Sequence, residues 1–482
     1  MHPLSGKTIM TLIASISGIR GTIGGQAGQA LTPLDVTKFA AAYGQWLLDT
    51  QAPPKVIIGR DARISGPMVE ALCTATLRMM GIEVITLGLS TTPTVEMAVP
   101  FHQAGGGIIV TASHNPGNWN ALKLLNSRGE FISAEDGERL LEIAGSGQIT
   151  FAESKKMGEH SADAEALNRH IQAILEVDGV DVPAIQKRGF RVIVDAVNSS
   201  GGIAVPQLLS VLGVDQVTKL YCEPNGQFPH NPEPLAENLN HIMQEMKKGK
   251  FDLGIVVDPD VDRLVFICED GSMFGEEYTL VAVADYVLGR RRGGNTVSNL
   301  SSTRALQDIT ERHGGQYAAS AVGEVNVVNK MRETNAVIGG EGNGGVIVPE
   351  LHYGRDALVG IALFLSHLAH YGKSARMLRS TYPNYHISKN KIELTQGTDV
   401  DKIISQVRDK YKKNPANLED GVRLEFDKQW VHLRKSNTEP IIRIYSEADS
   451  AQTADALANK IIIDIKELLT AARGKVSGLV GK

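Results

Sequence analysis

The stretch Gly105–Lys123, GGGIIVTASHNPGNWNALK, places a serine in a polar turn directly after an apolar run. The apolar run predicts a strand over residues 108–111, and the turn TASHNP at 111–116 ends it. A serine held in a tight turn at a strand end is accessible and fixed in direction, so Ser113 is a candidate nucleophile or phosphoryl carrier. Taken alone, however, the turn is more typical of an ordinary Ser/Asn/Pro loop.

Strands and helices alternate outward from this stretch along most of the chain. The predicted strands end in polar or glycine-rich turns, and this rhythm is typical of mostly parallel sheets with helices on their faces. The predicted strands are 55–58, 83–87, 190–194, 251–257, 264–268, 295–299 and 336–338, and the predicted helices are 33–48, 67–80, 277–288 and one that begins at Ile203.

The last hundred residues follow a different pattern, in which strands dominate. Strands are predicted over 387–394, 421–426, 430–434 and 441–446, with helices over 399–411 and 451–472. We therefore predict a fold of class α/β, with three similar mixed-sheet α/β domains followed by a smaller α+β domain. The expected boundaries are 1–155, 156–270, 271–384 and 385–482.

Composition limits the class of protein. At 482 residues and 42% hydrophobic content, the chain is too long for one ordinary domain and can fill several cores. A net charge of −5 and an aromatic content of 5% argue against a nucleic-acid-binding surface. Three scattered cysteines form neither a disulfide framework nor a metal knuckle, which fits a reducing compartment.

The expected location follows from two apolar segments. The N-terminal run in MHPLSGKTIMTLIAS is too brief for a secretory signal. The apolar stretch 358–368 is too short to span a bilayer and is predicted to be a buried helix. We therefore expect a soluble cytoplasmic protein with no nucleic-acid or membrane partner.

The segment Asp258–Arg263, DPDVDR, places three carboxylates at alternate positions after a predicted strand. Side chains two apart in an extended segment can lie on one side, where like charges raise one another's pKa unless a cation compensates them. Mg²⁺ prefers a few carboxylates together with phosphate or water oxygens. Asp258, Asp260 and Asp262 are therefore predicted to bind a metal rather than to form an acidic surface turn.

The same carboxylates, together with Glu269, also match the ligand positions of an EF-hand calcium loop. Two features exclude that interpretation. Arg263 stands where the invariant glycine is needed, and residues 264–268 are predicted to form a strand rather than to complete a loop.

The segment Gly340–Gly345, GEGNGG, matches the pattern G-x-G-x-x-G. A dinucleotide site is not expected, because Val346–Pro349 follows where that motif needs a helix. The carboxylate of Glu341 and the amide of Asn343 suit vicinal sugar hydroxyls better. A glycine-rich turn with exposed polar residues explains the loop equally well.

Arginines in turns form the remaining motifs. Arg434–Arg443, RKSNTEPIIR, combines hydroxyls and guanidinium groups in a turn between strands, which can hold a phosphate or can be a solvated β-turn. Ser15–Gly25, SISGIRGTIGG, and Gly59–Arg63, GRDAR, also place arginines in glycine-flanked turns. For these two, surface arginines are the simpler interpretation.

Together the motifs resemble those of the α-D-phosphohexomutase superfamily, and the resemblance covers nearly the whole chain. It implies four domains around a central cleft, the first three sharing one α/β topology. The motifs occur in the order and spacing of that family: SGIRG at 17–21, TASHNP at 111–116, DPDVDR at 258–263, GEGNGG at 340–345 and SNTEP at 436–440.

The resemblance implies a role for each motif. Ser113 would carry a phosphoryl group and, with Asp258, Asp260 and Asp262, bind Mg²⁺. Arg263 and Lys123 would supply positive charge, and Lys123 and His114 are candidates for general acid/base work. The implied substrate-binding residues are Arg20, Glu341, Asn343, Arg434, Ser436, Asn437, Thr438 and Arg443.

The implied reaction moves phosphate between the C6 and C1 oxygens of a hexose through a 1,6-bisphosphate intermediate. The partner would be a small-molecule phosphosugar, a hexose 1,6-bisphosphate would act as activator, and the protein would be a monomer or a homodimer. Because phosphoryl transfer depends mostly on positioning and charge stabilisation, the motif chemistry fits this reaction.

The prediction of the preferred sugar depends on one residue position. Glu324 follows Val322-Gly323, where phosphomannomutase/phosphoglucomutase enzymes often carry histidine and phosphoglucosamine mutases tend to carry an acidic residue. A carboxylate suits the ammonium group of glucosamine phosphate, so we predict a phosphoglucosamine mutase, with a bifunctional phosphomannomutase/phosphoglucomutase as the alternative. A structural carboxylate at a helix N-terminus also explains Glu324. The sugar loop departs from the common pattern, because Asn343 stands where serine is usual.

Two functions of other classes compete with this prediction. A non-catalytic phosphosugar-binding protein would be indicated by loss of Ser113 or of an aspartate of the triplet, and all are present. A metal-dependent phosphatase would need no separate hold on the sugar and the distal phosphate, whereas both motifs are present.

Overall fold

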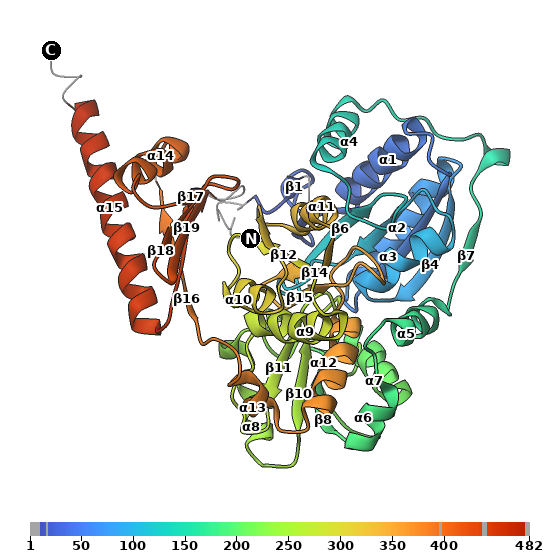
Figure 1. The fold of residues 1–482 in the computed structure, drawn as a ribbon. Helices are drawn as coiled ribbons and strands as arrows, with labels where there is room; N and C mark the ends of the chain where they lie inside the picture. Colours follow the sequence, from blue (N-terminus) through green and yellow to red (C-terminus); the bar gives the residue numbers. More distant parts are fainter. Residues whose placement is uncertain (1–9, 16–17, 395–397, 436–440, 478–482) are drawn as a thin grey trace, which may run out of the picture. The chain divides into compact units, whose positions relative to one another are not determined.

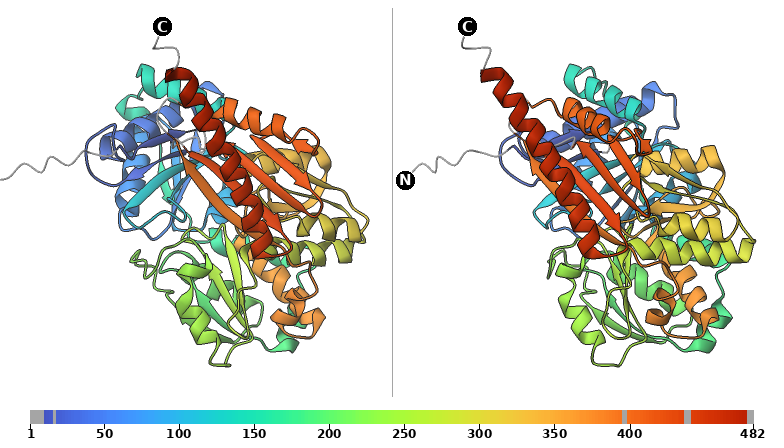
Figure 2. Two further views of the ribbon diagram at one scale, coloured as in Figure 1. Left: turned by 90° about the vertical axis from the view of Figure 1, so that its left-hand side faces the viewer. Right: turned by 60° about the vertical axis from the view of Figure 1, so that its left-hand side comes forward.

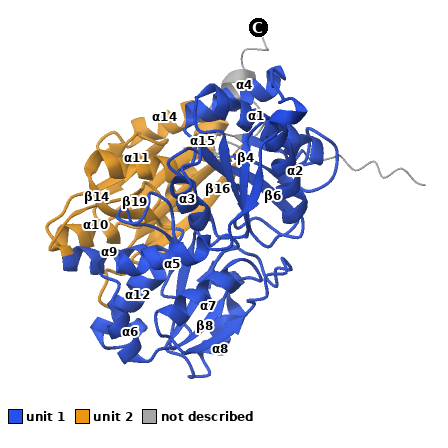
Figure 3. Ribbon diagram, turned by 90° about the vertical axis from the view of Figure 1, so that its right-hand side faces the viewer, with its two compact units in different colours: residues 1–290, 343–379 blue, residues 291–342, 380–482 orange. Residues whose placement is uncertain are grey.

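A computed structural model describes residues 10–15, 18–394, 398–435 and 441–477 (Figure 1). The chain forms two compact units, which Figure 3 shows in different colours. The large unit comprises residues 1–290 and 343–379, and the small unit comprises residues 291–342 and 380–482. The domain boundaries expected from the sequence remain a prediction.

The serine turn lies in a seven-stranded sheet of the large unit, with the strand order β1-β2-β6-β5-β3-β4-β7. Strands β5, β3, β4 and β7 run parallel, whereas β6, β2 and β1 pair antiparallel. The strands are β1 (Ile13–Ser15), β2 (Gly18–Thr22), β3 (Lys55–Arg60), β4 (Glu83–Leu89), β5 (Gly106–Val110), β6 (Trp119–Leu125) and β7 (His160–Ala162).

The TASHNP turn therefore joins two antiparallel strands, β5 and β6, and no helix follows it. The connection between Val110 and Trp119 is too short for the crossover that a parallel neighbour would need. This antiparallel return places the end of β5 beside the start of β6. The strand itself ends at Val110, one residue before the predicted end.

Helices cover both faces of this sheet, as the sequence predicts. Val56 and Ile58 of β3 pack with α1, α2 and α4, and Ile57 between them packs on the opposite face with α3. The helices are α1 (Pro33–Asp49), α2 (Gly66–Met79), α3 (Thr92–Phe101) and α4 (Ala134–Ser146).

The second sheet of the large unit carries the aspartate triplet. Its strand order is β11-β10-β8-β9, with β10, β8 and β9 parallel and β11 antiparallel. The DPDVDR turn joins β10 to β11, so the predicted strand over 264–268 is confirmed and the calcium loop is excluded. The strands are β8 (Arg191–Asp195), β9 (Gln216–Leu220), β10 (Leu253–Val257) and β11 (Leu264–Cys268).

The remaining elements of the large unit are mainly helices. The predicted buried helix over 358–368 is confirmed within α12, which packs against α5, α6 and α7. These elements are α5 (Ala166–Glu176), α6 (Val182–Arg188), α7 (Gly201–Val211), α8 (Asn240–Met246), α9 (Glu276–Arg291), β15 (Gly345–Ile347), α12 (Ala357–Tyr371), α13 (Ala375–Arg379) and the 3-10 turns Ser154–Lys156 and Ala236–Asn238.

The first part of the small unit is a parallel sheet in which β12 lies between β13 and β14. Strand β14 continues three residues beyond its predicted end and finishes at Glu341, inside the GEGNGG motif. The elements are β12 (Asn295–Asn299), α10 (Ala305–Arg312), β13 (Tyr317–Ser320), α11 (Glu324–Thr334) and β14 (Ala336–Glu341).

The second part of the small unit is the predicted α+β region. Its antiparallel sheet has the order β16-β20-β19-β18-β17, and α15 lies across it (Figure 2). Ile442 and Ile444 of β20 are fully buried in the core with Ile461 and Ile465 of α15. The elements are β16 (His386–Glu393), α14 (Val400–Lys410), β17 (Ala416–Asn417), β18 (Val422–Phe426), β19 (Gln429–Lys435), β20 (Ile441–Ala448) and α15 (Ala451–Ser477).

Across the described parts of the chain, every helix is either too short or too polar to cross a membrane.

Candidate active site

Ser113 occupies a strained turn at the end of β5. Its φ is +47°, a left-handed conformation that is uncommon for a residue with a side chain and that clusters at functional sites. The backbone N–H donates to Oγ1 of Thr111 at 2.9 Å, and the Ser113 hydroxyl donates to Oδ2 of Asp258 at 2.8 Å. The serine turn and the aspartate triplet, which are 145 residues apart, therefore meet.

The side chain of Arg63 hydrogen-bonds to the backbone of the serine turn. Its side chain is fully buried, and its Nε contacts Oδ2 of Asp61 at 3.0 Å. The interpretation of Arg63 as a surface arginine is therefore wrong, because its guanidinium replaces water as the donor for a ring of inward-facing carbonyls. These carbonyls belong to Ser113 (2.5 Å), Asn115 (2.7 Å), Pro116 (2.6 Å) and Trp119 (3.0 Å).

We expect Arg63→Lys to lower kcat by about 100-fold with little change in KM, because a small displacement of the Ser113 turn misaligns the reacting atom. An ammonium group cannot reach all four carbonyls, and each buried carbonyl left without a donor costs about 1–3 kcal/mol of folding stability. Steady-state kinetics and thermal unfolding check both effects. Arg128→Lys, at an exposed position, is the matched control; an unchanged kcat in Arg63→Lys would contradict the positioning role.

The three carboxylates of the triplet are fully buried and lie together. One oxygen from each of Asp258, Asp260 and Asp262 lies within 4.8 Å of the others. Val261 between them has a φ of +63°, which makes the turn tight enough to bring them together. Within the described residues, the Oδ1 atoms of Asp260 and Asp262 are buried without a hydrogen-bond partner. Buried carboxylate oxygens without hydrogen-bond partners fit Mg²⁺.

Two cations border the triplet. Lys123 Nζ lies 2.7 Å from Oδ2 of Asp260 and 3.1 Å from Oδ2 of Asp262, and Arg355 donates to Oδ2 of Asp262 at 2.8 Å. Burial opposes the charge on Lys123, but the two aspartates outweigh it and raise the lysine pKa above its usual value. Lys123 is therefore a fixed positive charge at neutral pH.

The same surrounding charges give the acidic residues different pKa values. Burial, followed by the charges of Asp262 and Asp260, raises the pKa of Asp258 well above its usual value. Burial also acts to raise the pKa of Asp262, but Arg355 and Lys123 lower it below its usual value. Asp258 thus gains more than Asp262 from an additional cation.

His114 lies next to the serine and is neutral. Burial, followed by the nearby charge of Arg263, lowers the pKa of His114 to about 2. Its Nδ1 lies 3.4 Å from Ser113 Oγ. His114 and Lys123 both remain candidates for general acid/base work.

Three other predicted residues, Arg20, Arg263 and Asn343, belong to the large unit. Arg20 is half-buried in β2, which pairs with β6, the strand that carries Lys123. Arg263 ends the DPDVDR turn, where its N–H donates to Oδ1 of Asp258 and its guanidinium lies 3.7 Å from Glu233. Asn343 is half-buried, and its Oδ1 accepts from Gly345 N at 3.2 Å.

Glu341 lies in the small unit, at the end of β14. Its Oε1 accepts from Asn299 Nδ2 at 2.8 Å and from the N–H of Gly323 at 3.1 Å. The turn before Glu324 therefore contacts the carboxylate of the sugar loop. Glu324 itself is 8% exposed and lies in the first turn of α11, where the helix dipole favours a negative charge.

The predicted phosphate motif is only partly described. Arg434 and Arg443 are cross-strand neighbours in β19 and β20, and Arg434 forms an ion pair with Asp420 at 3.0 Å. Ser436, Asn437 and Thr438 lie outside the described residues.

Sequence reasoning missed three residues that contact the reactive groups. Arg63 holds the serine turn, Arg355 contacts Asp262, and Thr92 donates from Oγ1 to Oδ2 of Asp260 at 2.5 Å. The tetrapeptide GRDA occurs twice, at 59–62 and 354–357; Arg355 lies inside the second copy, whereas the first copy contains Arg60 and Arg63 follows it. No periodicity or composition marked Thr92.

Comparisons with known proteins agree with this architecture. Four family models match in order: Phosphoglucomutase/phosphomannomutase alpha/beta/alpha domains I (residues 13–148), II (168–271) and III (275–385) and the C-terminal domain (392–463). A phosphoglucomutase/phosphomannomutase of Thermococcus kodakarensis is 36% identical over 440 residues, covering 90% of this chain and 95% of that protein. A protein of Methanopyrus kandleri named "Probable phosphoglucosamine mutase" is 31% identical, with coverages of 95% and 98%.

Solved structures share the fold. The crystal structure of a phosphoglucomutase/phosphomannomutase family protein from Burkholderia thailandensis matches with a TM-score of 0.81 and 26% identity, covering 97% of this chain and 98% of that one. N-acetylphosphoglucosamine mutase of Aspergillus fumigatus, solved in complex with GlcNAc-6P and magnesium, matches with a TM-score of 0.53 and 15% identity, covering 86% and 83% of the two chains. The predicted fold class is thus confirmed.

Proposed function

The chain belongs to the phosphoglucomutase/phosphomannomutase family, and we propose that within this family of phosphohexose mutases it converts glucosamine 6-phosphate to glucosamine 1-phosphate. It is an isomerase-type phosphotransferase, as its relatives are. The observation that carries the reaction is the contact between the strained Ser113 and the buried triplet. The assignment of glucosamine as the sugar is based on Glu324 beside the sugar loop.

Phosphorylated Ser113 passes its phosphoryl group to the free C1 hydroxyl of a hexose 6-phosphate. The Ser113 Oγ–P bond breaks as the bond from phosphorus to the C1 oxygen forms, which gives a hexose 1,6-bisphosphate. The bisphosphate then turns round and returns its C6 phosphoryl group to Ser113 Oγ. The proton of the attacking hydroxyl passes to a general base, for which His114 beside Ser113 and Lys123 are the candidates, and it returns in the second half.

Asp258, Asp260, Asp262 and an oxygen of phosphorylated Ser113 would hold Mg²⁺. When bound, Mg²⁺ offsets the negative charge of the transferring phosphoryl group. Support comes from the buried Oδ1 atoms of the triplet without hydrogen-bond partners and from the magnesium complex of the Aspergillus fumigatus enzyme.

Fixed positive charges of the chain assist the same step. Lys123 and Arg355 compensate two of the aspartates, and Arg263 at the end of the turn would supply a further positive charge. Because these charges are buried and held by ion pairs, they need no reorganisation as the phosphoryl group moves.

The remaining predicted residues hold the substrate at a distance from the reacting oxygen. Glu341 and Asn343 bind sugar hydroxyls, and a second group of residues binds the phosphate that is not reacting. Because these residues can bind the phosphate at either end of the sugar, the bisphosphate can bind in both orientations. The second group consists of Arg20, Arg434, Ser436, Asn437, Thr438 and Arg443.

The preference for an amino sugar rests on two neighbouring carboxylates of the small unit. The N–H of Gly323 donates to Glu341, so Glu324 directly follows a residue that contacts the sugar loop. An ammonium group on C2 gains from a nearby carboxylate, whereas a hydroxyl gains less. The alternative is a bifunctional phosphomannomutase/phosphoglucomutase, which the name of the Thermococcus kodakarensis relative supports.

The deciding experiment compares kcat/KM for glucosamine, glucose and mannose phosphates, with Mg²⁺ and a trace of hexose 1,6-bisphosphate as activator. We expect the amino sugar to be preferred, and Glu324→Gln to lower that preference about tenfold, which corresponds to about 1.4 kcal/mol. Glu333→Gln, on the exposed side of the same helix, is the matched control.

Equal or higher values for glucose and mannose would select the bifunctional alternative and leave Glu324 with a structural role. Phosphate release without isomer formation would indicate a phosphatase. We further propose that the enzyme is cytoplasmic, that it is a monomer or a homodimer, and that its domains are bounded at 1–155, 156–270, 271–384 and 385–482.

A further inference from the structure

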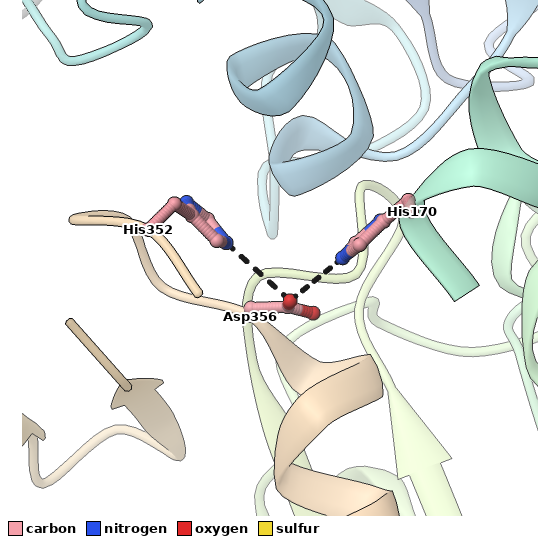
Figure 4. Close-up of side chains that lie close together, drawn as sticks. All are labelled: His170, His352 and Asp356. Carbon is pink, nitrogen blue, oxygen red and sulfur yellow. Dashed lines mark hydrogen bonds and ion pairs between the residues drawn. The ribbon is translucent and has the colours of Figure 1, made fainter. Parts of the chain in front are cut away.

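A second cluster of metal-binding side chains lies in the large unit, separate from the aspartate triplet. His170 of α5, His352 and Asp356 each offer one atom, and these atoms all lie within 4.8 Å of one another. Figure 4 shows both imidazole rings directed at the same carboxylate. His170 Nε2 lies 2.9 Å and His352 Nε2 lies 3.4 Å from Oδ2 of Asp356.

The other oxygen of Asp356 is already used. Asp356 is the N-cap of α12, and its Oδ1 accepts from the N–H of Leu358 at 2.8 Å and of Val359 at 3.4 Å. The carboxylate is fully buried and its orientation is therefore fixed, with Oδ2 presented to the two imidazoles.

A polar side chain also lies near the Nδ1 atom of each imidazole. Thr94 Oγ1 lies 2.9 Å from Nδ1 of His170, and Oε2 of the buried Glu96 lies 3.4 Å from Nδ1 of His352. For His170 this is the arrangement typical of metal-binding histidines, in which a hydroxyl, carbonyl or carboxylate accepts the proton of one ring nitrogen and leaves the other nitrogen free to bind the metal; for His352 the carboxylate of Glu96 lies at ion-pair distance only.

Distances and charge both suit a divalent transition metal. With Zn–N and Zn–O bonds of about 2.0–2.2 Å, the ligand atoms of a tetrahedral site are about 3.4 Å apart. The His352–Asp356 distance of 3.4 Å already equals that value, and the His170–Asp356 distance of 2.9 Å needs an opening of about half an ångström. Two carboxylates, Asp356 and Glu96, are buried near these two histidines, and a divalent cation would add positive charge to this cluster.

We propose that His170 Nε2, His352 Nε2 and Asp356 Oδ2 bind a zinc-class divalent metal ion, with Glu96 and Thr94 orienting the two imidazoles. Two imidazoles and one carboxylate favour such a metal over Mg²⁺, which prefers oxygen ligands. His352 is only partly buried, with a side-chain exposure of 13%, and gives the ion a path of entry.

The site has a structural consequence for the reaction. It joins α5 to the start of α12, and through Thr94 and Glu96 it also reaches α3. Arg355, which precedes the ligand Asp356, donates to Asp262 of the triplet. A bound metal therefore fixes the backbone that positions Arg355, while taking no part in phosphoryl transfer.

Metal analysis of the whole chain tests this proposal. The protein is stripped with a chelator, incubated with one equivalent of Zn²⁺ in millimolar Mg²⁺, and passed through a desalting column. We expect about one zinc per chain in the wild type and in Asp262→Asn, which removes the triplet as a competing site. His352→Gln is expected to weaken zinc binding at least about 100-fold, and His241→Gln, at an exposed position, is expected to leave it unchanged.

X-ray absorption at the zinc edge gives a second readout that needs no variant. Two imidazole ligands are expected from the wild type, and a zinc ion bound only by oxygen would overturn the proposal. So would zinc that is absent from the wild type, zinc retained in His352→Gln, or zinc that disappears in Asp262→Asn. None of these outcomes depends on mutase activity, so failure here is distinguishable from failure of the proposed reaction.

Discussion

Ser113→Ala is expected to lower kcat by about 10⁴-fold or more, because the change removes the hydroxyl that carries the phosphoryl group. The fold should survive the change. The serine hydroxyl contacts only Asp258 and His114 among the described residues, whereas Arg63 holds the turn through backbone carbonyls that alanine retains. A coupled assay of mutase turnover measures the loss.

Mass spectrometry of the intact protein separates this loss from misfolding. After incubation with glucose 1,6-bisphosphate, the wild type is expected to gain one phosphoryl group and Ser113→Ala none. Ser127→Ala, an exposed serine in the turn after β6, should match the wild type in both assays. Turnover within tenfold of the wild type in Ser113→Ala would refute the role of Ser113 as carrier.

Asp262→Asn is expected to weaken Mg²⁺ binding and to lower kcat/KM by about 10²- to 10³-fold, because a metal ion contributes several kcal/mol to a phosphoryl-transfer step. Asp262 has two tasks in the structure. Its Oδ1 is one of the buried oxygens without a hydrogen-bond partner, and its Oδ2 compensates Lys123 and Arg355. The asparagine variant keeps the shape of the side chain but leaves both cations with one negative charge fewer.

A titration of activity with Mg²⁺ distinguishes this effect from loss of the phosphoryl carrier. High Mg²⁺ should restore part of the activity of Asp262→Asn, whereas it should not restore Ser113→Ala. Asp215→Asn, an exposed aspartate, serves as the control of equal charge change. If Asp262→Asn needs no more Mg²⁺ than the wild type, the triplet does not hold the metal.

Short motifs predicted much of the site because each lies in a single turn. Residue type and spacing predict the metal-binding triplet Asp258–Asp262, whereas Ser113 is assigned as phosphoryl carrier only through the order of the motifs together; each lies at the end of a buried strand as expected. The antiparallel return of β6 was not predicted, because its apolar residues fit either strand direction and only the shortness of the connection determines the pairing.

Arg63, Arg355 and the histidine–aspartate cluster could not be assigned in the same way. A lone arginine in a glycine-flanked turn has the same local pattern whether it is solvated or buried. Its role depends on which carbonyls or carboxylates the rest of the chain brings within about 3 Å, and those partners lie 50 or more residues away. His170 and His352 similarly meet only because α5 and the start of α12 pack together.

The sequence by itself determined the order of strands and helices, the α/β class and the chemistry of each turn, because these depend on periodicity and residue type over a few neighbouring positions. The tertiary structure decided which charges face one another. It placed Lys123 and Arg355 on the triplet, made Asp258 and Asp262 differ in pKa although they are four residues apart, and buried Arg63 against the Ser113 turn. Charge interactions act through space between residues far apart in the chain, so only the folded arrangement fixes their sign and strength.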